Sequence, residues 1–243
     1  MLCVILITLL VYVNSGQLFP SANGQRTVCN DLESTNALPV LLIHGWNEGS
    51  ARWDQWVELL DREDIPSCTV SFQYSNDACG RAIDHANELG KIIQNTKESS
   101  GQNQVNLVGY SKGGLDARVY LDINPSSDDV ANLIMIGTPN AGSPFALSTN
   151  RCWPGIEDLR RGSPATEAEE NVHTKYHTIA GTCLPYYAIG VLVIIPEPND
   201  GLVGVTSINS RSYFHSLGYS PNCHLYLLGY YEYQMAHDIL IGN

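Results

Sequence analysis

Short runs of apolar residues alternate along this chain with segments in which apolar residues recur every three or four positions. The apolar runs have the length of buried strands and lie at residues 39–43, 67–73, 104–110, 130–136 and 176–181. The periodic segments are typical of helices with one buried face and lie at residues 50–63, 82–96 and 112–121. Since strands that alternate with helices form a mostly parallel sheet flanked by helices, the pattern predicts an α/β fold.

The helix expected at 82–96 shows the pattern in detail. Its predicted buried face contains Ile83, Ala86, Leu89, Gly90 and Ile93.

The alternation stops after Gly137. Residues 138–174 are rich in proline, glycine, serine and charged residues, whereas residues 184–196 are apolar. A buried core segment is the simpler interpretation of 184–196, and a lid over an apolar ligand is the alternative. We expect a single domain over 16–243 with an irregular insertion or lid at about 140–196.

An apolar run of twelve residues, LCVILITLLVYV, occupies positions 2–13. Spanning a bilayer takes about 20 residues, so this run fits the apolar region of a secretory signal peptide. Val13 and Ser15 supply small residues for cleavage after position 15, which predicts a signal peptide at 1–15. Because no lysine or arginine precedes the run, a buried first strand is the alternative.

The number of cysteines is consistent with export of the protein. Of the seven cysteines, Cys3 would leave with the signal peptide, and the even number that remains indicates disulfides in a secreted or extracellular protein. Six cysteines allow many pairings, and none of their spacings is typical of a zinc site. The sequence does not choose among these pairings: Cys68–Cys79 and Cys152–Cys183 would close short loops, and Cys29–Cys223 would then be left.

Composition narrows the classes of partner. The chain of 243 residues has 25 Asp and Glu against 13 Lys and Arg, a net charge of −12, and 44% of its residues are hydrophobic. This is the apolar content of a globular domain with a sizeable core. The acidic balance, with no cluster of basic residues, excludes nucleic acid and disfavours anionic membrane surfaces.

The sequence Gly109-Tyr110-Ser111-Lys112-Gly113 lies where the strand at 104–110 meets the helix at 112–121. A serine in a G-x-S-x-G turn between a strand and a helix is typical of a hydrolase nucleophile, because the tight turn exposes its Oγ at the edge of the sheet. The neighbouring N–H groups at the start of the helix stabilise negative charge.

A second motif, His44-Gly45-Trp46, directly follows the strand at 39–43. In a hydrolase site, the loop after an early strand supplies one of the backbone donors to the oxyanion. We therefore expect the backbone N–H groups of Trp46 and Lys112 to bind the oxyanion, and His44 to hold the loop rather than act as the base.

Four segments, LLIHGW, NLVGYSKGGLDAR, IGTPNAGSP and PNDGLVGVTS, resemble those of α/β-hydrolase fold lipases, above all secreted bacterial-type triacylglycerol lipases. The resemblance covers about residues 38–240. It implies the α/β-hydrolase fold and a Ser–Asp–His triad in that order along the chain. It also implies ester hydrolysis through an acyl-enzyme, in many cases beneath a mobile lid.

Matching positions assign the triad through this resemblance. Ser111 matches the nucleophile, and Asp200 in PNDGLV matches the acid, although Asn-Asp-Gly is also an ordinary turn. The base follows the acid in this fold, which leaves His215, His224 and His237. His224 is favoured, since it precedes a Leu-Leu pair and a C-terminal helix.

The two other histidines lie in less suitable places. His237 falls within the final helix, and His215 lies within a last strand at 212–217. A disulfide from Cys223 would pin the loop of His224.

Other residues receive secondary roles. Lys112 replaces the more common Met or Gln, and its cation is expected to affect substrate preference or to cover the pocket rim. Asp116 and Arg118 are expected to form a structural polar pair. The candidates for the acyl pocket and lid surface are Trp46, Phe145, Tyr186 and Tyr187.

These expectations describe an exported lipase or esterase that acts on small-molecule or lipid esters of apolar acids, with transient contact to a lipid interface. A thioesterase, a polyester depolymerase and a catalytically silent binding module are the alternatives. No cofactor is expected. Calcium occurs in some lipases of this kind, but the sequence assigns no ligands to it. The oligomeric state is left open.

Overall fold

The computed structural model describes residues 27–30, 32, 37–146, 152–184 and 195–242. The predicted signal peptide, Cys3, Tyr186 and Tyr187 lie outside the described residues, as does most of the apolar segment 184–196.

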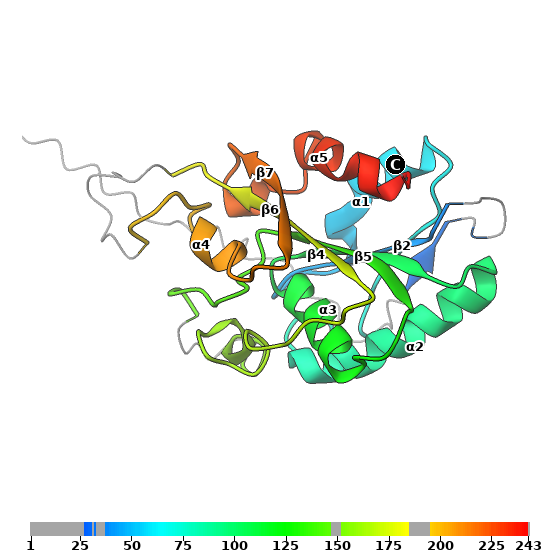
Figure 1. Ribbon diagram of the computed structural model, residues 1–243, viewed down its shortest axis with the longest axis horizontal. Helices are drawn as coiled ribbons and strands as arrows, with labels where there is room; N and C mark the ends of the chain where they lie inside the picture. The colour runs from blue at the N-terminus through cyan, green and yellow to red at the C-terminus, as the bar shows by residue number, and fades with distance from the viewer. Residues whose placement is uncertain (1–26, 31, 33–36, 147–151, 185–194, 243) are drawn as a thin grey trace, which may run out of the picture.

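A sheet of seven strands in the order β1-β3-β2-β4-β5-β6-β7 forms the centre of the molecule (Figure 1). Its strands are β1 (Val28–Cys29), β2 (Val40–Ile43), β3 (Ser67–Thr69), β4 (Val105–Tyr110), β5 (Val130–Ile136), β6 (Lys175–Gly181) and β7 (Phe214–Ser220). Strand β1 pairs with β3 antiparallel, and all other neighbours are parallel. The predicted α/β fold with a mostly parallel sheet is confirmed.

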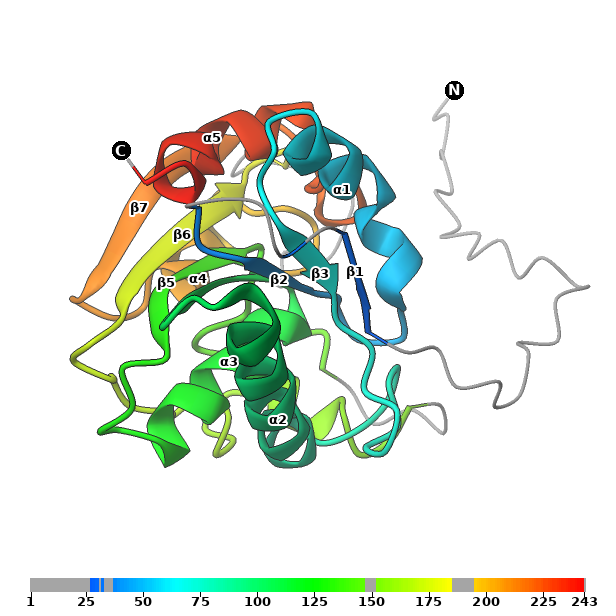
Figure 2. The ribbon, with the colours of Figure 1, turned by 90° about the vertical axis from the view of Figure 1, so that its right-hand side faces the viewer.

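Helices cover both faces of the sheet: α1 (Asp54–Asp61) and α5 (Tyr230–Leu240) on one, α2 (Ala82–Ser100) and α3 (Lys112–Ile123) on the other (Figure 2). Successive side chains of a strand point to opposite faces of the sheet, so each strand contributes to the core on both faces. In β2, Leu41 and Ile43 pack with the core of α2 and α3, whereas Val40 and Leu42 pack with that of α1 and α5. Strands buried on both faces explain the continuous apolar runs of the sequence.

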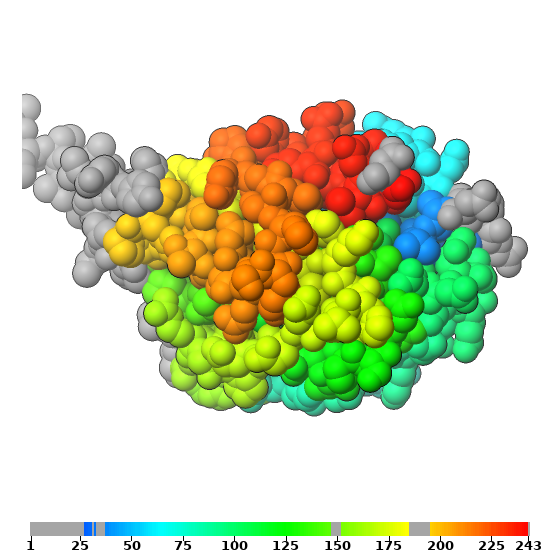
Figure 3. Space-filling view, in the orientation of Figure 1, coloured from blue at the N-terminus to red at the C-terminus, as the bar shows by residue number. Residues whose placement is uncertain are grey.

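The remaining helical elements are short: η1 (Ser50–Trp53), η2 (Glu157–Leu159), α4 (Val205–Ile208) and η3 (His224–Tyr226). Strand β7 lies at the edge of the sheet, and its residues reach the surface beside α5 (Figure 3). No helix within the described ranges is long and apolar enough to cross a membrane.

The side chains expected on the buried face of α2 are buried except that of Ile83, and Gly90 is half-buried. Ala86, Leu89 and Ile93 are fully buried, but the side chain of Ile83 is 44% exposed. Ala82 takes its place, since 82, 86, 89 and 93 follow the helical period more closely than 83 does.

An irregular segment at 137–174 separates β5 from β6; β6 itself lies within the range 140–196 expected for the insertion or lid. In its described residues the one regular element is η2. Buried hydrogen bonds hold the segment to the body: Arg118 of α3 donates to the carbonyl oxygens of Asn140 and Ala168, at 3.2 and 2.5 Å. Arg81 pairs with Asp158 at 2.9 Å.

The cysteines in the described part of the chain form three disulfides, Cys29–Cys68, Cys79–Cys152 and Cys183–Cys223. The sequence left the pairing open, and the structure does not contain the short-loop pairs Cys68–Cys79 and Cys152–Cys183 or the pair Cys29–Cys223. Sheet topology explains the difference, because the pairing of β1 with β3 places Cys29 opposite Cys68. The separate expectation that Cys223 pins the His224 loop agrees with the structure.

Candidate active site

Four segments that each follow a parallel strand meet at the end of the sheet where these strands have their carboxyl ends. The loop 44–47 follows β2, Ser111 follows β4, Asp200 lies in the connection after β6, and His224 follows β7. The carboxyl ends of parallel strands meet at a common edge, which is the usual place for a site in such sheets. The sheet therefore collects residues that are far apart in the sequence.

Ser111 lies in a sharp turn between β4 and α3, with φ 52° and ψ −120°. Glycines make this turn sterically feasible. A Cβ on Gly109 would lie 2.5 Å from the Cα of Gly114, and one on Gly113 would lie 2.3 Å from the carbonyl oxygen of Ile43. The G-x-S-x-G pattern thus reflects close backbone contact on both sides of the serine.

Hydrogen bonds join Ser111, His224 and Asp200. The Ser111 Oγ lies 2.9 Å from His224 Nε2, and His224 Nδ1 lies 2.7 Å from Asp200 Oδ2. Their exposed fractions are 9% for Ser111, 5% for His224 and 1% for Asp200. The structure thus brings together the three residues that the sequence reasoning favoured.

The two competing histidines lie elsewhere. His215 is on the edge strand β7, where its ring centroid is 6.0 Å from that of His177. His237 is on α5, where its Nε2 lies 2.8 Å from a Glu63 carboxylate oxygen.

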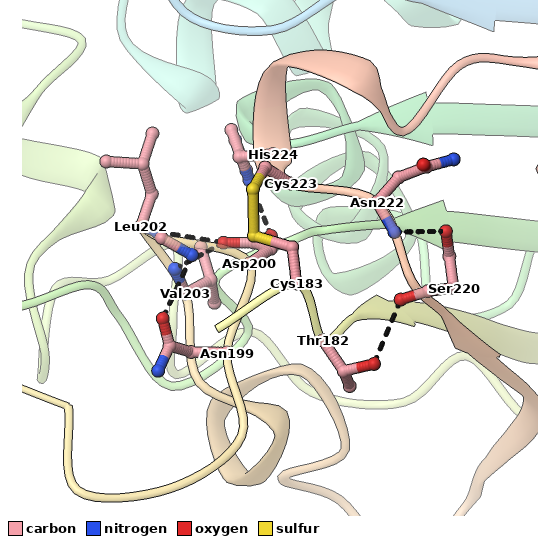
Figure 4. Close-up of a disulfide and its surroundings, with 11 residues drawn as sticks. Thr182, Cys183, Asn199, Asp200, Leu202, Val203, Ser220, Asn222, Cys223 and His224 are labelled. Atoms are coloured by element: carbon pink, nitrogen blue, oxygen red, sulfur yellow. Dashed lines mark hydrogen bonds and ion pairs between the residues drawn. A yellow bond between two sulfur atoms is a disulfide. The ribbon is translucent and has the colours of Figure 1, made fainter. Parts of the chain in front are cut away.

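Backbone groups orient the Asp200 carboxylate (Figure 4). Its Oδ1 accepts hydrogen bonds from the N–H groups of Leu202 and Val203, at 2.9 and 2.7 Å. Its other oxygen is therefore directed to His224. Hydrogen bonds within the Asn-Asp-Gly segment, from the Gly201 N–H to Asn199 Oδ1 and from the Leu202 N–H to Asp200 Oδ1, show that it is also a local turn.

The His224 loop is held from three sides. The disulfide Cys183–Cys223 links it to the end of β6 (Figure 4), and the His224 N–H donates to the Asp200 carbonyl at 2.8 Å. The Tyr110 hydroxyl donates to the His224 carbonyl at 2.7 Å. Burial and the negative charge of Glu48 raise the pKa of Tyr110, so this hydroxyl remains a donor at neutral pH. Sequence reasoning missed this role of Tyr110, although the residue directly precedes Ser111.

The loop after β2 lies against the nucleophile, since a Cβ on Gly45 would be 3.2 Å from that of Ser111. The Gly45 N–H donates to Glu48 Oε2 at 3.2 Å, and the Asn47 N–H donates to the Ala78 carbonyl at 2.7 Å. The N–H groups of Trp46 and Lys112 have no hydrogen-bond partner among the described residues. They are therefore free to bind an anion beside Ser111.

The Lys112 side chain is not at the pocket rim, in contrast to the expectation. It is 1% exposed, and its Nζ donates to Asp116 Oδ1 at 2.5 Å and lies 3.3 Å from His85 Nδ1. Burial alone would raise the pKa of Asp116, but the charges of Lys112 and His85 outweigh it and lower the pKa. Asp116 therefore pairs with Lys112 and His85, and the expected pair of Asp116 with Arg118 is wrong.

A cavity of about 350 Å³ opens over Ser111 and His224. Its lining is largely apolar and includes Trp46, Tyr110, Pro139, Phe145, Ala146, Ile156, Leu159, Leu202, Val203 and Leu225. Of the residues named for the acyl pocket and lid surface, Trp46 and Phe145 line this cavity, whereas Tyr186 and Tyr187 lie outside the described residues. In the described part of the chain no group of three or more His, Cys, Asp or Glu side chains is arranged to hold a metal ion.

Comparison with known proteins gives relatives among hydrolases. A triacylglycerol lipase of Burkholderia plantarii is 29% identical over 134 residues, which cover 51% of this chain and 36% of the relative. A proline iminopeptidase of Lactobacillus delbrueckii subsp. bulgaricus is 28% identical over 195 residues, covering 74% of this chain and 63% of the relative. The chain thus spans less than two thirds of either relative.

Solved structures share the fold. The mature form of a Bacillus licheniformis lipase superposes with a TM-score of 0.74 at 20% identity, covering 90% of this chain and all of that one. Lipase B of Aspergillus fumigatus gives a TM-score of 0.53 at 15% identity, over 79% of this chain and 46% of that one. The sheet and its helices are therefore those of an α/β-hydrolase. Residues 39–180, more than half of the chain, match the palmitoyl protein thioesterase family, and the chain belongs to that family.

Proposed function

We propose that this protein hydrolyses esters and thioesters of apolar carboxylic acids, with Ser111 as nucleophile, His224 as general base and Asp200 as its orienting acid. One observation carries the proposal: an unbroken series of hydrogen bonds from Asp200 through His224 to Ser111 ends beneath an apolar cavity. A serine, a histidine and a carboxylate in this order form the machinery of acyl transfer.

The first half-reaction forms an acyl-enzyme. His224 Nε2 accepts the proton of Ser111 Oγ, at 2.9 Å, as this oxygen attacks the carbonyl carbon. Asp200 holds the ring through Nδ1 and stabilises the imidazolium. The Trp46 and Lys112 N–H groups would bind the tetrahedral oxyanion, after which Nε2 protonates the departing alcohol or thiol.

The second half-reaction returns the enzyme to its starting state. Water enters the place of the leaving group, and His224 takes one of its protons as the oxygen attacks the acyl carbon. Collapse of the second tetrahedral intermediate releases the acid and restores the Ser111 hydroxyl. Every proton in this cycle moves through groups of this chain, so the proposal includes no cofactor.

The cavity favours an apolar acyl group over a charged ligand. The carboxylate of Glu48, which also lines the cavity, is paired with Arg52 at 3.2 Å and accepts the Gly45 N–H. Its charge is therefore balanced within the protein, and the rest of the cavity lining is largely apolar.

Active-site labelling tests the assignment. We expect a fluorophosphonate probe to label the wild type, and labelling and nitrophenyl ester hydrolysis to fall by about 10³-fold or more in Ser111→Ala and His224→Ala. His215→Ala and His237→Ala are matched controls that keep both signals. A wild-type protein that is neither labelled nor active would favour the silent binding module. Labelling that survives in Ser111→Ala would reject the nucleophile.

Substrate class is resolved by paired substrates. Oxygen and sulfur esters of the same acid, in a series of chain lengths with and without an emulsion, separate esterase, lipase and thioesterase. A prolyl peptide serves as the negative control, and the same assays in EDTA test the independence from metal ions. Activity on the peptide alone would contradict the proposed substrate class.

We further propose an oxidising, extracellular site of action. The three disulfides support this proposal, since structural disulfides persist in such compartments. The predicted signal peptide remains an expectation, and the N-terminal sequence of the exported protein would test it.

A further inference from the structure

His44 is a buried residue that the proposed reaction does not use directly. Its ring is 2% exposed and lies at the end of β2, next to the loop that contains Trp46. Nδ1 lies 3.0 Å from the Gly45 carbonyl oxygen, and Nε2 lies 2.9 Å from Asp77 Oδ1. Both partners are acceptors, so both contacts are hydrogen bonds only if the ring carries two protons. The imidazolium is thus the form of the ring in which both contacts are hydrogen bonds.

The Gly45 carbonyl belongs to the same peptide group as the Trp46 N–H. A trans peptide is planar, so its C=O and N–H point in opposite directions, and fixing one fixes the other. The N–H groups on both sides are engaged, that of Gly45 by Glu48 and that of Asn47 by Ala78. The hydrogen bond from His44 thus holds the peptide whose N–H remains free for the oxyanion.

We infer that His44, as an imidazolium paired with Asp77, is a positioning residue for the oxyanion site and orients the Trp46 N–H through the Gly45 carbonyl. This inference rests on the proposed function. A positively charged donor on the carbonyl also polarises the peptide, which strengthens its N–H as a donor.

The surroundings of the ring support the charged state. Asp77, in the loop after β3, and Asp116, on α3, are the charged groups that face His44. Burial works to lower the pKa of His44, but the hydrogen bond and the charge of Asp77 outweigh it, and the pKa lies above its usual value. Asp77 is held in turn by the Phe72 N–H at 2.5 Å and the Ser71 hydroxyl at 3.1 Å.

Two isosteric substitutions separate orientation from stability. His44→Asn keeps a donor near the place of Nδ1 and loses the contact with Asp77, whereas His44→Gln keeps a donor near the place of Nε2 and loses the contact with Gly45. We expect kcat to fall about 100-fold in His44→Gln, since a small misplacement of a reacting group has an effect of this order. In His44→Asn, kcat stays within about 10-fold of the wild type.

If His44 only stabilised the fold, the variant with the lower melting temperature would also have the lower kcat. Both variants remove the positive charge, but only His44→Asn also leaves the partly buried Asp77 carboxylate without a hydrogen-bond donor at this place, so this variant should have the lower melting temperature, although it keeps the higher kcat. KM should change little in both, because the oxyanion exists only in the transition state. If kcat follows the melting temperature, or if both variants keep the wild-type kcat, the inference is overturned.

Titration provides a test that is independent of the reaction. Nitrogen NMR of the full chain should find both His44 ring nitrogens protonated at neutral pH, and a neutral ring there would reject the inference even if Ser111 is the nucleophile.

The pH profile of kcat provides a second test. As the pH rises and His44 loses a proton, the remaining ring proton stays on Nε2, which faces the Asp77 carboxylate, and the Gly45 carbonyl loses its donor. The alkaline decline of kcat that follows should be absent in His44→Asn, and its persistence there would contradict the role of His44. A wild-type protein without activity would instead reject the proposed function.

Discussion

At the scale of single residues, the conformation of Ser111 depends on neighbours that have no side chain. Its φ of 52° and ψ of −120° place the Oγ above the end of the sheet, and such backbone conformations persist only where the surroundings impose them. Gly109 and Gly114 supply these surroundings by allowing β4 and α3 to touch. The strain is therefore located where the proposed chemistry occurs.

Gly109→Ala should disrupt this turn. The added Cβ would lie 2.5 Å from the backbone of Gly114, so β4 and α3 must separate and Ser111 must move. We expect a loss of about 2 kcal/mol or more in unfolding free energy and a fall in kcat of about 100-fold, measured by denaturant unfolding and ester hydrolysis.

Gly90→Ala is the matched control. It lies within α2, where the added Cβ meets the flexible ring of Tyr120 at 3.2 Å and alanine favours the helix. This variant should keep its activity and its stability. Equal effects of the two substitutions would show that the contact at Gly109 is not special.

Local motifs and the family resemblance were enough to predict Ser111, Asp200 and His224 as neighbours, but not the residues that hold them and the loop after β2. The G-x-S-x-G turn and the His-Gly-Trp loop are local patterns whose chemistry follows from the strand that precedes them. The contact of His44 with Asp77 joins positions 33 residues apart, and that of Tyr110 with His224 joins positions 114 apart. No local pattern marks such partners, because they meet only when the sheet is assembled.

At the scale of elements, the positions of strands with continuous apolar runs could be predicted, but the strands that lie next to one another in the sheet could not. Strand β5 occupies the predicted residues 130–136, because burial on both faces demands an unbroken apolar run. Strand β1 has two residues, too few to show a pattern, and it is held by pairing with β3. The disulfide pairing stayed open for the same reason, since short loops in the sequence say little about which strands are neighbours.

Two disulfides of similar loop length have different positions relative to the site. Cys183–Cys223 closes 40 residues and joins β6 to the His224 loop, whereas Cys29–Cys68 closes 39 residues at the other end of the sheet. Chain entropy predicts a loss of about 4 kcal/mol for either pair when it is replaced by alanines.

Activity should separate the two pairs. Removal of Cys183–Cys223 releases the loop that presents His224, so kcat should fall about 10-fold or more at a temperature where the variant is still folded. The variant without Cys29–Cys68 should keep its kcat. Unchanged kcat in both double variants would mean that the Tyr110 and Asp200 contacts are sufficient to hold the base.

At the scale of the whole molecule, acid stability depends in part on His177 in β6. Burial, together with the positive charges of His215 and Lys175, lowers the pKa of this histidine to about 4 from 6.5. Between these two values the unfolded chain binds a proton that the folded chain does not, so folding stability decreases as the pH falls from about 6.5 to about 4. Allowing for screening by solvent, the loss is about 2 kcal/mol.

His177→Gln should remove this part of the pH dependence. The amide retains a polar group opposite Asn132, whose Oδ1 lies 3.2 Å from His177 Nε2, and it does not titrate. We expect urea unfolding at pH 7 and at pH 4.5 to show a smaller difference in the variant than in the wild type. Parallel profiles of the two proteins would assign the acid loss to other groups.

The three disulfides share an order along the chain that affects how the protein matures. Among the described cysteines, each pairs with the next: Cys29 with Cys68, Cys79 with Cys152, and Cys183 with Cys223. During synthesis the N-terminal part emerges first. When the second cysteine of each pair emerges, its correct partner is the one described cysteine still unpaired. Oxidation in step with synthesis therefore yields the native connectivity without an isomerase, whereas a fully reduced chain that reoxidises as a whole must select it from many alternatives.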